Sequence, residues 1–193
     1  MTFLPNGYKE PVTDNYMKFQ DGKNVFRVLS TAIVGMEYWK TETNENGEEV
    51  RKPIRKRMNE NIPVEDLGLD KWGNPERPKH FWAFVVYNRQ DEKIQILEVT
   101  QSKIRKGIKN FVEDEDWGDP KEYDLVVTRS GEKLETDYVV SNKPKSKIDP
   151  AIVKEYEDMK INLEALYDGE DPFKQNEEEW TDKDIDEVIK EVE

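Results

Sequence analysis

The densest group of side chains that could do chemistry is a basic run. Five of the seven residues from 51 to 57 are lysine or arginine, and none is acidic: Arg51, Lys52, Arg55, Lys56 and Arg57. Such side chains neutralise phosphates and release the counterions condensed on a nucleic acid. A basic run can also be only a solvated face. We expect these five cations to be exposed in a loop and to contact phosphates.

Aromatic residues flank this charge. Tyr38 and Trp39 precede the run, Trp72 follows it, and the segment 81–87 is almost wholly apolar. Proteins that bind single strands without sequence preference pair a positive groove with aromatic faces, each worth about 1–3 kcal/mol per stacked base. Trp39 and Trp72 stand in polar surroundings and are expected to be exposed. Both faces of 81–87 are apolar, so the sequence leaves open which face lines the core.

Catalytic and metal-binding chemistry finds little support. The acidic run 113–116 could supply acid–base groups, but no nucleophile–base motif, phosphate-binding loop or HExxH pattern accompanies it. The chain has no cysteine and only one histidine, His80, which excludes disulfides, thiolate zinc sites and His-rich metal sites. We therefore expect no enzyme activity, no cofactor and no metal.

The net charge of −13 is unevenly distributed. Residues 155–193 carry 16 acidic and 4 basic residues, whereas residues 1–154 carry 27 acidic and 26 basic ones. Terminal charge blocks of this kind are typically disordered interaction tails, although a tail can also serve solubility alone. We expect an acidic tail over 168–193 that occupies the basic groove or binds a partner through its apolar residues Trp180, Ile185, Val188 and Ile189.

Hydrophobic periodicity predicts the elements that position these residues. Strands are expected at 25–39, with a kink or bulge at Gly35, and at 81–87, 94–99, 123–128 and 136–140, with a helix after residue 102. Between the first two strands we expect a β-ribbon that turns at Asn46-Gly47, followed by a long irregular excursion. This order fits a mainly β chain with an OB-fold, a five-stranded Greek-key barrel with one intervening helix. The expected organisation is an N-terminal arm 1–24, an OB domain 25–148 with an inserted loop 40–79, an extra C-terminal helix 149–167 and the disordered tail 168–193.

Targeting signals are not apparent. No apolar run approaches the roughly 20 residues that span a bilayer, and residues 1–11 lack the pattern of a signal peptide. We expect a cytoplasmic protein that does not bind membranes.

Two stretches carry a resemblance to a known family. The first is Tyr16 to Phe19 followed by Asp21 to Leu29, and the second runs from Asp114 through Pro120 to Gly131. In these ordered motifs the chain resembles bacteriophage single-stranded DNA-binding proteins over roughly residues 5–145, and the acidic tail extends the likeness.

The resemblance implies an OB-fold protein that coats single-stranded DNA without sequence preference during replication, recombination and repair. Its tail would recruit polymerase or helicase partners, and the protein would lie in the host cytoplasm if a phage encodes it. The resemblance assigns phosphate binding to Arg27, the 51–57 cations and Lys79. It assigns base stacking to Trp39, Trp72 and Trp82. Some relatives carry a zinc ribbon, which a chain without cysteine cannot form.

Two other functions remain open. A protein-interaction adaptor could use the same barrel and tail without nucleic acid. A single-stranded RNA-binding protein could use the same stacking surface. The salt dependence of binding separates the adaptor from a protein that tracks phosphates.

Overall fold

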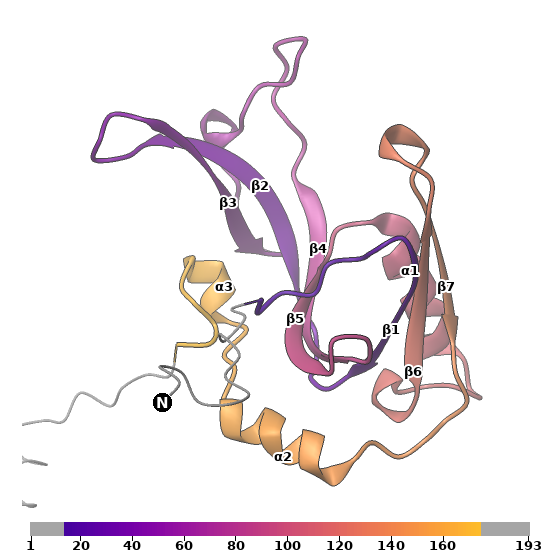
Figure 1. The fold of residues 1–193 in the computed structure, drawn as a ribbon. Helices are drawn as coiled ribbons and strands as arrows, with labels where there is room; N and C mark the ends of the chain where they lie inside the picture. Colours follow the sequence, from indigo (N-terminus) through magenta and orange to yellow (C-terminus); the bar gives the residue numbers. More distant parts are fainter. Residues whose placement is uncertain (1–13, 175–193) are drawn as a thin grey trace, which may run out of the picture.

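The computed structural model describes residues 14–174, which form a mainly β fold with few helices (Figure 1). The described strands are β1 (Gly22–Val28), β2 (Ile33–Thr43), β3 (Glu49–Arg57), β4 (Lys79–Asn88), β5 (Lys93–Val99), β6 (Asp124–Ser130) and β7 (Asp137–Asn142). The helices are α1 (Ser102–Glu113), α2 (Pro150–Met159) and α3 (Ala165–Asp168), with short 3₁₀ turns η1 (Val64–Asp66), η2 (Pro120–Glu122) and η3 (Lys133–Glu135).

All seven described strands join one antiparallel sheet. Six of them follow the order β3-β2-β4-β1-β6-β7, and β5 pairs with β4 outside this order. β1 and β2 pair with successive parts of β4, through Val28 opposite Val86 and Ile33 opposite Ala83. The predicted strand 25–39 is therefore two strands separated by residues 29–32. β5 and β7 do not pair within the described residues, so the sheet is open there.

The predicted kink at Gly35 is wrong, because Gly35 lies in regular pairing between Arg57 of β3 and Phe81 of β4. The glycine is needed for close approach. A Cβ atom at this position would lie 2.2 Å from the backbone oxygen of Lys56 and 2.8 Å from Cε1 of Phe81.

We expect Gly35→Ala to destabilise the fold by about 1–3 kcal/mol or more, because the backbone of β3 must move to admit one methyl group. Chemical denaturation of the variant measures the free energy of unfolding. Gly47→Ala is not a suitable control because Gly47 has a positive φ of 80°. Thr41→Ala, at an exposed position of the same strand, should cost far less. Equal costs for the two variants would contradict the close-approach explanation.

The inserted loop 40–79 is more regular than predicted. β2 continues to Thr43, the chain turns at Asn44–Glu48 with Gly47 in the left-handed region, and β3 returns along β2 to Arg57. The turn predicted at Asn46-Gly47 is confirmed. The basic run is therefore the outer strand of a ribbon and not a loop, and only residues 58–78 form an irregular excursion.

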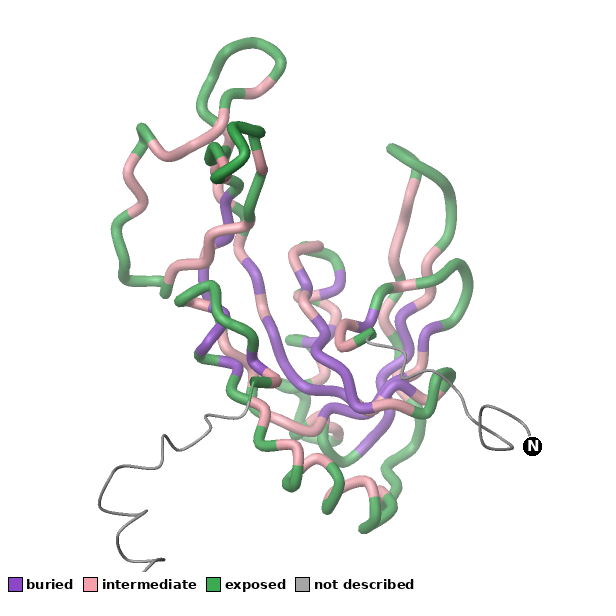
Figure 2. Tube along the Cα trace, turned by 60° about the vertical axis from the view of Figure 1, so that its left-hand side comes forward, coloured by how far each residue is buried: buried purple, intermediate pink, exposed green. Residues whose placement is uncertain are grey.

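The core has two parts, one on each face of β4. On one face Phe84 and Val86 pack with α1, whose buried residues are Ile104 and Ile108. On the other face Phe81, Ala83 and Val85 pack against the C-terminal segment, including Leu163 and Leu166. The alternation along β4 answers which face of 81–87 lines the core. Both faces of this strand do, and both are apolar because both are buried (Figure 2).

The C-terminal segment differs from the predicted single helix 149–167. Asp149 and Pro150 begin α2 as expected, with the Asp149 carboxylate accepting a hydrogen bond from the Ala151 amide. Lys160, at φ 46°, ends it, and α3 follows after a turn. The first residues of the predicted tail also pack, since the ring of Phe173 lies 6.3 Å from that of Tyr16. Trp180, Ile185, Val188 and Ile189 lie outside the described residues.

The N-terminal arm lies on the body over its described part. Tyr16 forms a parallel bridge with Ile96, and Met17 is buried. The β2–β3 ribbon with its excursion, and the β6–β7 hairpin, project on either side of the molecule in both views (Figures 1 and 2). None of the helices in residues 14–174 has the length and apolar character to cross a membrane.

Candidate nucleic-acid interface

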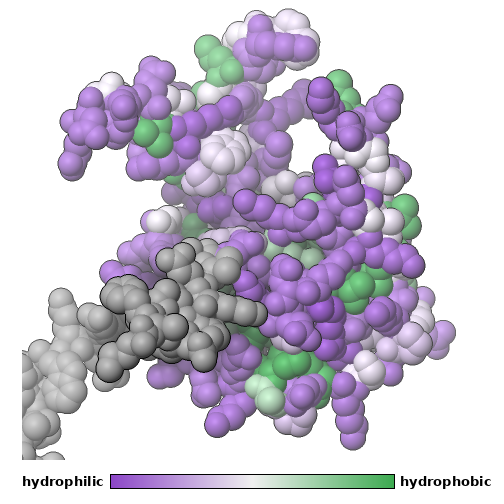
Figure 3. Space-filling view, viewed as in Figure 1, coloured by the Kyte–Doolittle hydropathy of each residue, from purple (hydrophilic) through white to green (hydrophobic). Residues whose placement is uncertain are grey.

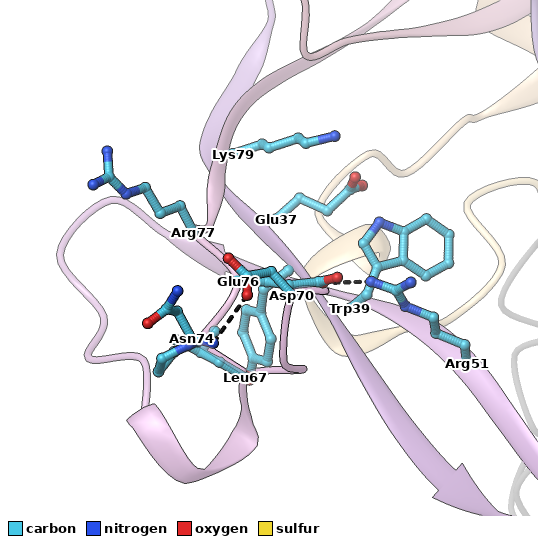
Figure 4. A pocket seen from close by; sticks show the side chains of 11 residues that line it. Glu37, Trp39, Arg51, Leu67, Asp70, Asn74, Glu76, Arg77 and Lys79 are labelled. Atoms are coloured by element: carbon cyan, nitrogen blue, oxygen red, sulfur yellow. Dashed lines mark hydrogen bonds and ion pairs between the residues drawn. The ribbon is translucent and has the colours of Figure 1, made fainter. Parts of the chain in front are cut away.

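A cavity of about 920 Å³ opens between the β2–β3 ribbon and the end of the excursion (Figure 4). Residues of β2, β3, β4 and the segment 67–77 line it: Glu37, Tyr38, Trp39, Arg51, Leu67, Asp70, Asn74, Pro75, Glu76, Arg77 and Lys79. This cavity, called the ribbon cavity below, combines aromatic, cationic and anionic side chains.

Trp39 is the exposed aromatic side chain of the ribbon cavity, with 37% of its surface accessible. The guanidinium of Arg51 lies 5.6 Å from the centre of the Trp39 ring and forms an ion pair with Glu76. Lys79 and Glu37 extend to the same side from paired positions of β4 and β2, whereas Arg77 points away to the other side (Figure 4).

A second cavity, of about 320 Å³, lies beside the β6–β7 hairpin. Its lining residues come from the N-terminal arm, the end of β5 and the two hairpin strands: Met17, Lys18, Phe19, Glu98, Gln101, Arg129 and Tyr138. The rings of Phe19 and Tyr138 are 6.0 Å apart, and Arg129 forms an ion pair with Asp21 at 2.7 Å. We call this the hairpin cavity. It brings together the two stretches that carry the family resemblance.

Arg55 links the two cavities. Its Nη2 atom lies 3.2 Å from Glu37 Oε2, in the ribbon cavity, and 2.7 Å from Glu98 Oε2, in the hairpin cavity. Strand register places Arg55 opposite Glu37, and Glu98 opposite Ala83, on one face of the sheet. Arg55 therefore lies between the two cavities, and we call the two cavities together with Arg55 the channel.

The centre of the channel is shielded from water. The Arg55 side chain is only 12% exposed, and burial raises the pKa of Glu37, with Arg55 opposing and Glu98 adding to the rise. Three cations at the edges, Lys18, Arg77 and Lys79, have no ion-pair partner within the described residues. The channel thus combines aromatic side chains with positive charge at its edges that has no ion-pair partner in the described residues.

The strand period divides the predicted basic run. Arg51, Arg55 and Arg57 share the face of the channel, whereas Lys52 and Lys56 project from the opposite face, 3.6 Å from Glu42 and 4.0 Å from Glu60. Arg57 is held outside the channel by α3, where its Nη2 lies 2.8 Å from Glu164 Oε2 and its guanidinium 4.4 Å from the Tyr167 ring. Each of the five cations has a carboxylate partner, and the expected loop is a strand, while the phosphate role of these cations stays a prediction.

The phosphate role expected for Arg27 is also wrong. Arg27 is 1% exposed, and its guanidinium donates hydrogen bonds to Asp124, to the backbone oxygens of Lys121 and Ser146, and to the Ser146 hydroxyl. Arg89 binds the same Asp124 carboxylate. Arg27 therefore ties β1 to the start of β6, to η2 before it and to the segment after β7, and it is too buried to contact a ligand.

The predicted tryptophans separate in the structure. Trp39 and Lys79 line the ribbon cavity together, whereas Trp72 is 74% exposed on the excursion with Lys71 Nζ 4.2 Å from its ring centre, outside both cavities. Trp82 lies on the α1 face of β4, where its indole Nε1 donates to His80 Nε2 at 2.9 Å. Trp82 cannot stack a base in the channel.

Sequence reasoning missed most of the hairpin cavity. Lys18, Phe19, Arg129 and Tyr138 come from segments more than 100 residues apart. The two stretches that carry the family resemblance contain three of these residues, Lys18, Phe19 and Arg129. The sequence assigned no role to any of them.

The α1 face carries a third cavity of about 550 Å³, and its lining is mainly apolar, including Val34, Trp82, Phe84, Ile108 and Val112. By contrast, the side of the molecule seen in Figure 3 is mostly hydrophilic, with its apolar groups in separate patches.

Within residues 14–174, no three His, Asp or Glu side chains are placed to hold a metal ion. A comparison of the chain with protein-family models, curated proteins and solved structures finds no match.

Proposed function

We propose that this chain binds single-stranded DNA along the channel and coats it during phage DNA replication, recombination and repair. One observation carries the proposal: Arg55 bridges two cavities with aromatic side chains, Trp39 in one and Phe19 with Tyr138 in the other, and cations without an ion-pair partner in residues 14–174 line both cavities. Sequence-tolerant single-strand binding uses this combination of stacking faces and positive charge. The proposal assigns no catalytic reaction to the chain.

The strand order supports an OB-type fold as part of this proposal. β1 with β2 corresponds to a long first strand, β4 and β5 to the second and third, and β6 and β7 to the last two, with α1 between the third and fourth. The ribbon and excursion are then an insertion between the first two strands. An OB-fold binds oligonucleotides between its first and last hairpin loops, which are here the two projections that flank the channel (Figure 1).

A bound strand would stack bases on Trp39 and on the Phe19–Tyr138 pair, while its phosphates approach Lys18 and Lys79. The acidic tail would recruit polymerase or helicase partners through Trp180 and the apolar residues after it, which lie outside the described residues. Its 175–193 segment carries nine acidic and two basic residues and could compete with DNA for the channel.

The salt dependence of binding tests this arrangement. Because two cations that face the channel, Lys18 and Lys79, lack an ion-pair partner in residues 14–174, we expect log Kd to change with log salt with a slope of roughly 1.4 on a single strand, at about 0.7 per phosphate neutralised. Fluorescence anisotropy of a labelled oligonucleotide over a range of NaCl concentrations measures it. Lys79→Ala should lower the slope by about 0.7, whereas Lys52→Ala, on the opposite face, should not. Equal effects of the two variants would contradict the assignment of the channel.

A protein-interaction adaptor is the second candidate, and the apolar cavity on the α1 face favours it. Val34 and Val112 line this cavity and are exposed, and exposed apolar groups that lie together are typical of surfaces that bind a protein partner. An RNA strand would use the same stacking surface as DNA, and competition between RNA and DNA oligonucleotides of one sequence distinguishes these two ligands.

A further inference from the structure

The centre of the channel holds polar atoms without partners. Residues 14–174 contain five buried side-chain nitrogen or oxygen atoms that lack a hydrogen bond, and three of them are Arg55 Nε, Glu98 Oε1 and Gln101 Oε1. Glu98 binds Arg55 directly, and Glu98 and Gln101 line the hairpin cavity together. Native proteins leave few buried polar groups unpaired, so such a group calls for a physical reason.

Gln101 Oε1 accepts no hydrogen bond within the described residues. Gln101 is the N-cap residue of α1, yet its side chain makes no capping hydrogen bond. Glu98 and Glu37 place two carboxylates beside one guanidinium, so the channel centre carries more acceptors than donors. A phosphate would be repelled at this point, whereas N–H groups would be attracted.

The three unpaired atoms determine which hydrogen-bonding groups a ligand must offer at this point. They comprise one donor, Arg55 Nε, and two acceptors, Glu98 Oε1 and Gln101 Oε1. Cytosine offers an amino group with two N–H bonds beside a ring-nitrogen acceptor, and adenine offers the same pair on its own edge. Guanine offers N–H donors beside a carbonyl oxygen. Thymine has a single N–H donor on its pairing edge, so it would leave one acceptor unpaired.

We propose that Arg55, Glu98 and Gln101 form a base-edge subsite that favours bases with an exocyclic amino group over thymine. The inference rests on the proposed single-strand binding and adds a substrate preference to it. Because the three atoms are buried in the free protein, a base reaches them only when side chains that line the hairpin cavity move aside, and the phosphates then lie toward Lys18 and Lys79 at the edges. The partly buried ion pair of Arg55 holds the subsite in place.

The test compares oligo-dC with oligo-dT of equal length by anisotropy, at mildly alkaline pH where oligo-dC stays single-stranded. These pyrimidines differ chiefly in the groups on their edges. One hydrogen bond contributes roughly five- to tenfold in affinity, so we expect oligo-dC to bind tighter by about that factor. Gln101→Met retains the length of the side chain and removes the acceptor, and it should reduce the ratio of the two Kd values to near one.

Two further variants guard the interpretation. Glu98→Gln replaces the carboxylate with an amide and should also lower the ratio, with circular dichroism reporting whether the sheet is retained. Lys18→Met, at the channel edge, should weaken both oligonucleotides equally and leave the ratio unchanged.

The outcomes separate this inference from the proposed function. Failure of both oligonucleotides to bind would overturn single-strand binding itself. Equal affinity for the two would overturn the base-edge subsite alone, as expected if water fills the three hydrogen bonds. A preference that survives both Gln101→Met and Glu98→Gln would also overturn it, because the selectivity would then arise elsewhere.

Discussion

Arg27→Ala should destabilise the protein by about 3–5 kcal/mol, the usual cost of removing one partner from a buried ion pair. The substitution removes four hydrogen bonds to Asp124, Lys121 and Ser146. It leaves the Asp124 carboxylate with Arg89 as its charged partner. Urea denaturation of the variant and of the original protein gives the difference in the free energy of unfolding.

Lys109→Ala is the matched control for this variant. Lys109 belongs to an exposed ion pair with Glu113 on α1, and pairs of this kind contribute about 0–1 kcal/mol. A stable Arg27→Ala variant with weakened DNA binding would contradict the structural role and restore the phosphate role predicted from the sequence.

Trp39→Ala should weaken single-stranded DNA binding by about 1–3 kcal/mol, because it removes one stacking face of the channel. Tyr138→Leu keeps an apolar side chain against the core and removes the second face. The two residues lie in different cavities, so the losses should add in the double variant. Anisotropy titrations measure each Kd, and circular dichroism checks the fold.

Trp72→Ala is the matched control, since it removes an indole that is even more exposed than Trp39 and lies outside both cavities. Its binding should remain close to that of the original protein. If Trp72→Ala weakened binding as much as Trp39→Ala, the strand would follow the excursion and not the channel.

The sequence predicted the mainly β class and most strands because apolar periodicity reports burial directly. The strands 81–87, 94–99 and 123–128 are confirmed within a few residues as β4, β5 and β6. α1 also lies where its apolar spacing placed it, with Ile104 and Ile108 buried. These elements are buried against neighbours, so their patterns are strong.

The ribbon was predicted from its turn, but the extent of its second strand, β3, was missed for a physical reason. Its side chains are mostly charged because it is an outer strand with no fully buried residue, so no apolar alternation marks it. Pro53 also argues against a strand, but proline is tolerated on an edge strand, where its missing N–H costs no ladder bond. The two-residue strand period then decides which cations reach the channel.

The candidate site was predictable only in part. Trp39 and Lys79, two of the predicted binding residues, line one cavity because both lie close in sequence to the ribbon, and their binding roles stay predictions. The hairpin cavity depends on the pairing of β1 with β6 and of β6 with β7. Contacts across more than 100 residues leave no local pattern, so Phe19 and Tyr138 could not be assigned a role. Arg27 was misassigned because an apolar strand gives no sign of a buried ion-pair partner elsewhere in the chain.

Direct binding to single-stranded DNA is the central claim, and one titration tests it. A labelled oligonucleotide is titrated with the full chain as a single strand and as the matching duplex, in parallel with the Trp39→Ala, Tyr138→Leu double variant. The account predicts saturable binding of the single strand, weaker binding of the duplex, and a loss of about 2–6 kcal/mol in the double variant. Absence of single-strand binding, or equal binding by the original protein and the double variant, would contradict it.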